Sequence, residues 1–181
     1  MRGAVERPFL IGAAFGRPNL LKEVFILKFD LRFILRAAII AALYAALTML
    51  LAPISYGPLQ LRVSEALTLL PILTPAAVPG LFVGCLAANL LGGATALDVI
   101  FGSLATLAAA MLTRRFRDRP ILAALPPVVV NAFVVGAVLT YAYNLPFWLT
   151  VLQVGIGQIG ACYVLGLPLY YTLRRLPRNI W

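Results

Sequence analysis

The sequence predicts an all-α fold: a polytopic membrane protein whose bundle of about six transmembrane helices leaves the N- and C-termini in the cytoplasm. Of its 181 residues, 62% are hydrophobic and only 12% are charged, about half the charged fraction of a typical soluble domain. The basic residues gather in clusters instead of covering one face. The chain is therefore expected to lie in a lipid bilayer, and no nucleic-acid partner is expected despite the net charge of +9.

Residues 1–30 are predicted to form a cytoplasmic or interfacial extension, and residues 31–181 the membrane domain. The first segment mixes charged residues with apolar stretches that are too short to span a bilayer. Arg17, Lys22 and Lys28 follow its first apolar stretch, where a cleaved signal peptide would have small residues. We therefore expect an extension and not a signal peptide.

The rest of the chain divides into apolar stretches that are long enough to be membrane spans. Prolines and glycines, which do not continue a helix, mark most boundaries. The expected spans are 33–52, a second from about Ser64 that Pro71 and Pro75 break or kink, 79–91, 96–113, 120–143 and 146–173. With six spans, the three basic clusters lie on one side of the membrane: 2–36, 114–119 and 174–178. The positive-inside rule makes that side the cytoplasm.

Three charged residues, Arg62, Glu65 and Asp98, are the only ones between Arg36 and Arg114. All are predicted to lie near the outer ends of spans, where ionisable groups usually face the bundle interior or a wet cavity. Arg62 and Glu65 are three residues apart, so on one helix they could neutralise each other. The alternative is a ligand clamp, in which a carboxylate accepts N–H donors and a guanidinium donates to a carbonyl.

Amide side chains at a similar depth complete the predicted substrate-binding site. They are Gln60, Asn89, Asn131 and Gln158. For each one alone, a hydrogen bond between helices is the simpler explanation. Their shared depth, together with the charged residues, predicts a common pocket.

The first span carries columns of small residues. Ala37, Ala41 and Ala45 recur every four residues, and Ala38 begins a second column beside them. Small side chains let another helix approach closely, which is how helices associate in lipid. The columns therefore indicate either packing inside the bundle or a docking face for a partner subunit.

Two stretches of the chain resemble the QueT family, which are substrate-binding S components of energy-coupling factor (ECF) transporters. They are AALYAALTMLLAPISYGPLQLRVSEALTLLP, from Ala41 to Pro71, and PGLFVGCLAANLLGGATALDVIFGSLATL, from Pro79 to Leu107. The similarity extends from about Arg36 to Leu173 and leaves out the first 30 residues.

The resemblance implies a six-helix S component in the plasma membrane that takes up queuosine precursors, which are deazaguanine bases. It implies an outward-facing pocket gated by loop 53–63, which contains Tyr56 and Gly57. It further implies docking on a transmembrane T component through Ala37, Ala41 and Ala45, and a pair of ATPase subunits. Two alternatives remain open: a stand-alone secondary transporter, and an S component for a different small vitamin-like solute.

An enzyme is not expected. The chain contains no histidine, which removes Ser-His dyads, most zinc sites and haem ligation by histidine. It also contains no Walker A sequence, so it does not hydrolyse ATP itself. No metal and no cofactor are expected. Cys85 and Cys162 lie inside apolar segments, where a cysteine acts as a small hydrophobic residue more often than as half of a disulfide.

Overall fold

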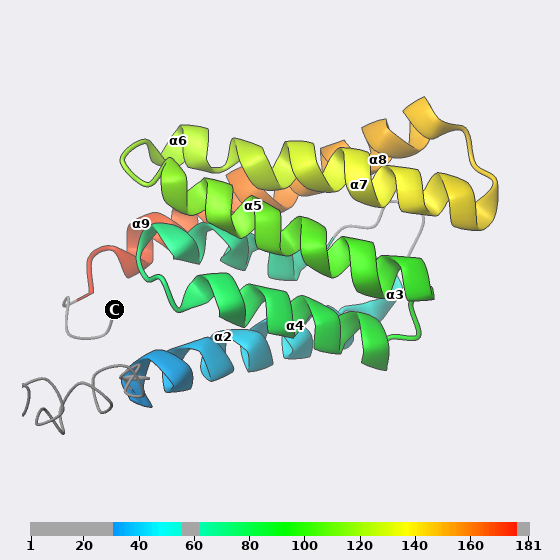
Figure 1. The fold of residues 1–181 in the computed structure, drawn as a ribbon. Coiled ribbons are helices and arrows are strands. Elements are labelled where there is room, and N and C mark those ends of the chain that lie inside the picture. Colours follow the sequence, from blue (N-terminus) through cyan, green and yellow to red (C-terminus); the bar gives the residue numbers. More distant parts are fainter. Residues whose placement is uncertain (1–30, 56–61, 177–181) are drawn as a thin grey trace, which may run out of the picture. The chain divides into compact units, whose positions relative to one another are not determined.

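The computed structural model describes residues 31–55 and 62–176 (Figure 1). From Arg32 onward the described residues belong to one compact unit. They are helical and contain no strand, so the all-α prediction is confirmed for this part of the chain. The predicted extension 1–30, the gating-loop residues Tyr56 and Gly57, and the candidate Gln60 lie outside the described residues and stay predictions.

The helices follow one another with short connections. They are α2 (Leu31–Leu50), α3 (Ala52–Ser55), η1 (Val63–Ile72), α4 (Ala77–Leu91), η2 (Asp98–Gly102), α5 (Ser103–Arg115), α6 (Pro120–Ala123), α7 (Leu125–Tyr143), α8 (Phe147–Ile159), η3 (Gly160–Gly166) and α9 (Leu167–Leu173). Among the described residues, three helical stretches are long and apolar enough to cross a membrane: Leu31–Leu50, Pro120–Tyr143 and Phe147–Leu173. Six crossings therefore stay a prediction.

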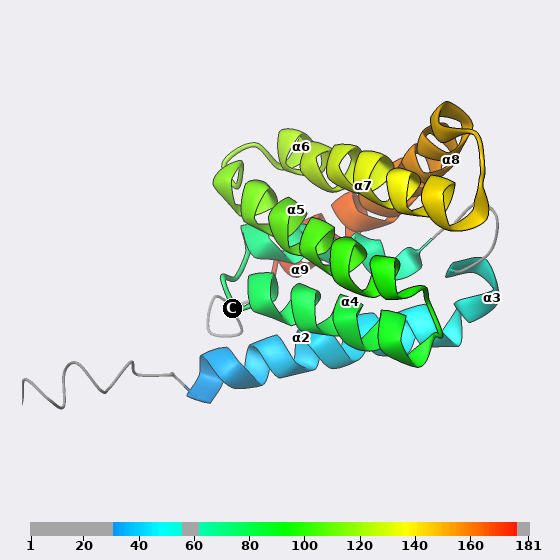
Figure 2. The same cartoon turned by 45° about the vertical axis from the view of Figure 1, so that its right-hand side comes forward.

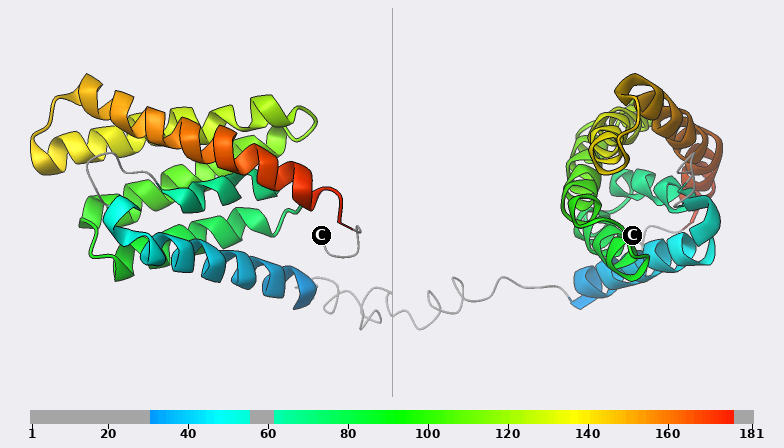
Figure 3. Two further views of the ribbon diagram at one scale, coloured as in Figure 1. Left: turned by 180° about the vertical axis from the view of Figure 1, so that it is seen from behind. Right: turned by 90° about the vertical axis from the view of Figure 1, so that its right-hand side faces the viewer.

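Most of these helices run side by side, so the described unit has two ends (Figures 1 and 2). The first turn of α2, the α5–α6 turn and the last turn of α9 lie at one end, and the view from behind shows the same arrangement (Figure 3). We call this the arginine-rich end, since it carries Arg32, Arg36, Arg114, Arg115, Arg117, Arg119, Arg174 and Arg175. The α4–η2 and α7–α8 turns lie at the opposite end. The described arginines of the predicted cytoplasmic clusters thus share one end, while its orientation in the membrane stays a prediction.

Helix η1 is a 3₁₀ helix whose residues from Ser64 to Pro71 are all buried. A helix that is buried all round belongs in the interior of a bundle. The expected break in the second span occurs, because η1 ends at Ile72 and α4 begins at Ala77. Pro71 lacks an N–H group and so removes one helical hydrogen bond just before that break.

Helix α2 packs closely against α4 at two glycines. A Cβ atom on Gly80 would lie 2.7 Å from the Ala37 carbonyl oxygen, and one on Gly84 would lie 2.8 Å from the Ala41 carbonyl oxygen. Only glycine allows backbones to approach this closely. This contact supports the packing interpretation for Ala37 and Ala41, and Ala45 is likewise half-buried. The second column is different, because its members are exposed: Ala38, Ala42 and Ala46.

Candidate functional site

The predicted site residues that the structure describes are all buried. None of these residues is more than 4% exposed: Arg62, Glu65, Asn89, Asp98, Asn131 and Gln158. They come from the residue before η1, from η1 itself, and from α4, η2, α7 and α8. Buried polar groups cost free energy unless they find partners, so their contacts define what the site can do.

Glu65 is held by two donors from different helices. The Tyr44 hydroxyl donates to Oε1 at 2.5 Å, and the Asn131 amide donates to Oε2 at 3.2 Å. These bonds connect η1 to α2 on one side and to α7 on the other. A carboxylate has about four lone-pair positions. Glu65 therefore retains capacity to accept from a ligand as well.

Asp98 forms an ion pair with Arg62. The Arg62 Nη2 atom lies 3.2 Å from Asp98 Oδ2, and both side chains are 5% exposed. The alternative to a ligand clamp, in which Arg62 and Glu65 neutralise each other on one helix, is therefore not observed, because Asp98 is the ion-pair partner of Arg62. The reason is local, because Arg62 precedes η1 in an extended conformation with φ −88° and ψ 100°. Its side chain consequently does not follow the helical spacing on which that alternative depended.

Asn89 supports the position of Asp98 from α4. Its Nδ2 atom donates to the Asp98 carbonyl oxygen at 3.1 Å, and the Asp98 backbone N–H donates to the Thr95 hydroxyl at 3.2 Å. Asp98 is also the first residue of η2, a turn of π-helix. Such turns are rare and occur frequently at functional sites. Asn89 and Asp98 thus meet across the turn at Gly92.

Several buried oxygen atoms in this region have no hydrogen-bond partner within residues 31–55 and 62–176. They are Asn89 Oδ1, Asp98 Oδ1, Ser103 Oγ and Asn131 Oδ1. Nearly all buried polar atoms in folded proteins are paired, so a group of unpaired ones needs an explanation. Acceptors gathered beside a carboxylate and a guanidinium are suited to a small ligand that carries N–H donors.

A small cavity lies among these side chains, and we call it the inner cavity. Arg62, Glu65, Gly102, Thr106, Asn131 and Gln158 help to line it. Its volume is about 10 Å³, roughly what one water molecule needs. Four of the predicted site residues thus line the same cavity. They come from η1, from the residue that precedes it, and from α7 and α8.

A second hollow of about 70 Å³ lies beside it at the α4–η2 turn, and we call it the end hollow. Asp98 lines the end hollow together with Gly92, Thr95 and Tyr143. Arg62 lines the inner cavity instead. The Arg62–Asp98 ion pair therefore stands between the two spaces.

The sequence reasoning missed Tyr44, Gly102 and Thr106. Tyr44 is fully buried in α2, where the neighbouring alanines drew attention to helix packing and away from the tyrosine. A tyrosine in the middle of an apolar span, away from the interfacial belts where tyrosines are common, was the available signal. Gly102 carries no such signal, since a glycine in a helix gives no indication of what lies beside it.

The two cysteines are buried free thiols on either side of this region. Cys85 accepts weak hydrogen bonds from Asn89 at 3.6 Å and from Thr106 at 3.4 Å. Cys162 donates to the Gln158 side-chain oxygen at 3.7 Å. Both therefore pack behind site residues as small, weakly polar groups.

Comparison with known proteins identifies a family for this chain. A sequence model of the QueT transporter family matches residues 34–175. No curated protein and no solved structure matches the chain. The matched range includes each of the buried site residues and most of the described helices. The chain therefore belongs to the QueT transporter family and is a transporter rather than an enzyme.

Proposed function

We propose that this chain is the substrate-binding S component of an ECF importer in the plasma membrane. Its substrate is a queuosine precursor of the deazaguanine type, bound among the helices that surround Glu65. Membership of a transporter family supports the transport role. The observation that carries the location of the site is the inner cavity, where a buried and unpaired oxygen of Asn131 lies beside Glu65 and Arg62.

The chemistry of the substrate favours Glu65 as the residue that recognises it. A guanine-like edge presents a ring N–H and an exocyclic amine side by side, and a carboxylate accepts both. Glu65 lines the inner cavity, whereas Asp98 pairs with Arg62 and lines the end hollow. We therefore assign the N–H edge to Glu65 and a supporting role to Asp98.

The other side chains of the inner cavity supply the remaining contacts. The ring carbonyl of a deazaguanine needs a donor, which the Arg62 guanidinium or the Gln158 amide provides. The unpaired Asn131 oxygen accepts from a further N–H group of the ligand. Together these groups match a flat heterocycle that has donors on one edge and an acceptor on the next.

Binding requires the helices around the inner cavity to separate, because a space for about one water molecule is far smaller than a bicyclic base. The proposal places the first movement at the Arg62–Asp98 ion pair. Arg62 is the second-last residue of the stretch that the family resemblance makes the gate, residues 53–63. Releasing Arg62 from Asp98 joins the end hollow to the inner cavity.

The proposal also includes six crossings, a T component and two ATPase subunits. The chain has no Walker A sequence, so ATP hydrolysis has to come from other subunits. Ala37 and Ala41 are engaged with α4. The exposed column of Ala38, Ala42 and Ala46 is therefore the face of α2 that we assign to contact with the T component.

The test of the ligand site is a calorimetric titration of the purified chain in detergent with a deazaguanine precursor. Replacing Glu65 with Gln should weaken binding by about 2 to 4 kcal/mol, roughly 30-fold to 1000-fold, since the ligand's donors lose a charged acceptor. The matched control is Asp118→Asn, because Asp118 is a carboxylate whose side chain is 91% exposed. Unchanged affinity in Glu65→Gln, with folding verified by thermal unfolding, would remove Glu65 from the site.

The test of the transport mechanism uses reconstituted vesicles. The chain alone should bind substrate but not concentrate it, and concentration should begin only when a T component and ATPase subunits are added with ATP. Accumulation by the chain alone, driven by an ion gradient, would instead identify a secondary transporter.

A further inference from the structure

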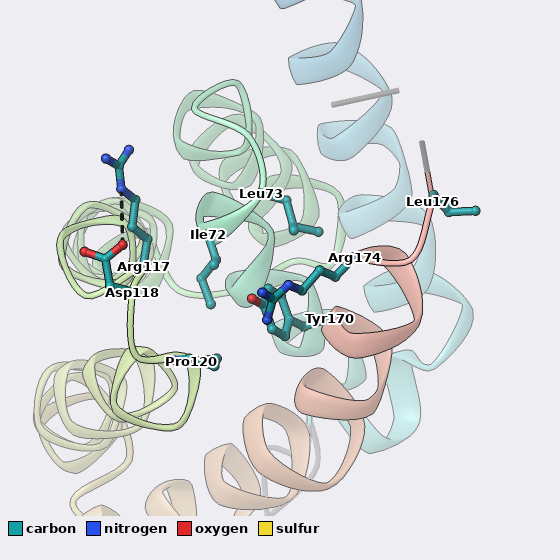
Figure 4. A pocket seen from close by; sticks show the side chains of 8 residues that line it. All are labelled: Ile72, Leu73, Arg117, Asp118, Pro120, Tyr170, Arg174 and Leu176. Carbon is teal, nitrogen blue, oxygen red and sulfur yellow. Dashed lines mark ion pairs between the residues drawn. The ribbon is translucent and has the colours of Figure 1, made fainter. Parts of the chain in front are cut away.

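A larger cavity lies at the arginine-rich end of the described unit, away from the residues around Glu65. Its volume is about 510 Å³, in the range that small-molecule ligands occupy. It lies between the end of η1, the α5–α6 turn and α9 (Figure 4). Side chains that line it include Ile72, Leu73, Arg117, Pro120, Tyr170 and Arg174. The function proposed above makes no use of this cavity.

The walls of this cavity carry positive charge on two sides. Figure 4 shows Arg117 on one side and Arg174 on the other, with Tyr170 next to Arg174. Guanidinium groups are the side chains best suited to bind phosphate. Asp118 also lines the cavity and lies 4.0 Å from Arg117, and since its side chain is 91% exposed, water screens this pair strongly. The lining thus carries two arginines against one aspartate, and its net charge is positive.

The floor of the cavity has the opposite character. Ile72, Leu73 and Pro120 are its apolar lining residues, which we call the apolar floor, and Figure 4 shows Ile72 between the two arginines. Beside it on the outside of α6 and α9, Ile121 is 64% exposed and Tyr171 is 44% exposed, as expected of side chains that face lipid. A cationic rim above an apolar floor suits a ligand that has a phosphate joined to hydrocarbon.

Hydrogen bonds fix the walls before any ligand arrives. The Arg114 guanidinium donates to the Pro71 carbonyl at 3.1 Å, which connects α5 to the end of η1. The Thr113 hydroxyl donates to the Ala123 carbonyl at 3.0 Å, and the Tyr163 hydroxyl donates to the Ile121 carbonyl at 3.1 Å. A preorganised cavity loses less conformational entropy when a ligand binds.

We propose that this cavity binds the headgroup of an anionic phospholipid. Arg117 and Arg174 hold the phosphate from opposite sides, and the apolar floor receives the glycerol and the first methylene groups. The other arginines of this end raise the local concentration of anionic lipid around the cavity. The apolar floor distinguishes this ligand from a free phosphate ion, which gains nothing from such a surface. The proposal does not depend on which solute the protein transports.

The experiment counts the lipids that the purified full chain retains. Native mass spectrometry in a neutral detergent measures binding of phosphatidylglycerol and of phosphatidylcholine to the wild type and to two double variants. One variant, Arg117→Gln with Arg174→Gln, removes the lining charges. The matched control, Arg115→Gln with Arg175→Gln, removes the same charge from the same helix ends, at exposed residues that do not line the cavity.

We expect the wild type and the control to prefer phosphatidylglycerol. The lining variant should lose about 5-fold in affinity for each arginine, and about 30-fold in all. Equal losses of affinity for phosphatidylglycerol in both double variants would show general charge attraction, and the proposed lipid site would then be wrong. Equal binding of the two lipids by the wild type would overturn it as well. Competition by millimolar inorganic phosphate would identify a soluble anion as the ligand, and the lipid assignment would then be wrong.

This test and the test of the proposed function are independent, so that either proposal can be wrong without the other. Titration with the deazaguanine precursor reports on the residues around Glu65, and lipid retention reports on Arg117 and Arg174. Thermal unfolding of each double variant checks that the fold is intact. Since Arg117 and Arg174 are exposed, we expect the unfolding midpoint of the variant that lacks both to match that of the wild type.

Discussion

Arg62 and Asp98 form an ion pair of 3.2 Å between the residue that precedes η1 and the first residue of η2, 36 positions further along the chain. Each side chain is 5% exposed, so water screens their attraction little. The pair also separates the inner cavity from the end hollow. One contact therefore bears on the stability of the fold and on access to the proposed site.

Removal of one member of this pair should destabilise the protein. Asp98→Asn leaves the Arg62 charge buried without its carboxylate, which should lower the free energy of unfolding by about 3 to 5 kcal/mol. Equilibrium unfolding in detergent measures the loss. The double change Arg62→Met with Asp98→Leu removes both charges and should recover much of it. Wild-type stability in Asp98→Asn would show that the pair contributes little.

An added methyl group at Gly102, which lines the inner cavity, should displace the Asp98 and Asn89 side chains next to it. A Cβ atom there would lie 2.8 Å from Asp98 Oδ1 and 3.4 Å from Asn89 Nδ2. We expect Gly102→Ala to weaken binding of a deazaguanine precursor at least about 10-fold, the effect of roughly 1.4 kcal/mol. Gly155→Ala is the control, since its Cβ would meet only Ala132 at an ordinary 3.6 Å. If both variants bind as the wild type does, the ligand lies elsewhere.

The two alanine columns of α2 should respond differently to a bulky residue. Ala42 is exposed, so Ala42→Leu should leave the unfolding midpoint and ligand binding unchanged while abolishing uptake by the complete transporter. Ala41 packs at Gly84, so Ala41→Leu should instead lower the unfolding midpoint by overpacking the α2–α4 contact. Full uptake by Ala42→Leu would exclude this column as the docking face.

Cysteine labelling should establish the orientation of the two ends. Ile54 is 49% exposed near the opposite end, and the Arg117 side chain is 58% exposed at the arginine-rich end. In intact cells an impermeant thiol reagent should label Ile54→Cys and not Arg117→Cys. The native Cys85 and Cys162 are buried and should give no background. Labelling only at position 117 would invert the proposed topology.

The sequence by itself determined the helical class and the identity of the polar residues in the interior. Glu65, Asp98 and Asn131 were predictable because a charge or amide inside an apolar stretch is costly unless it faces a cavity or a partner. The break after Pro71 was predictable because proline lacks the N–H group that a helix needs. Both inferences use the chemistry of single residues and need no knowledge of the neighbours.

Only the tertiary structure decided which of these groups meet. Arg62 pairs with Asp98 and not with Glu65, because the backbone is extended at Arg62, a feature that spacing along a regular helix does not show. Tyr44 reaches Glu65 because Gly80 and Gly84 let α2 approach α4 closely. Contacts between residues 21 or 36 positions apart depend on how several helices pack at once. The local sequence determines where each helix forms, and the packing of all the helices determines which side chains contact one another.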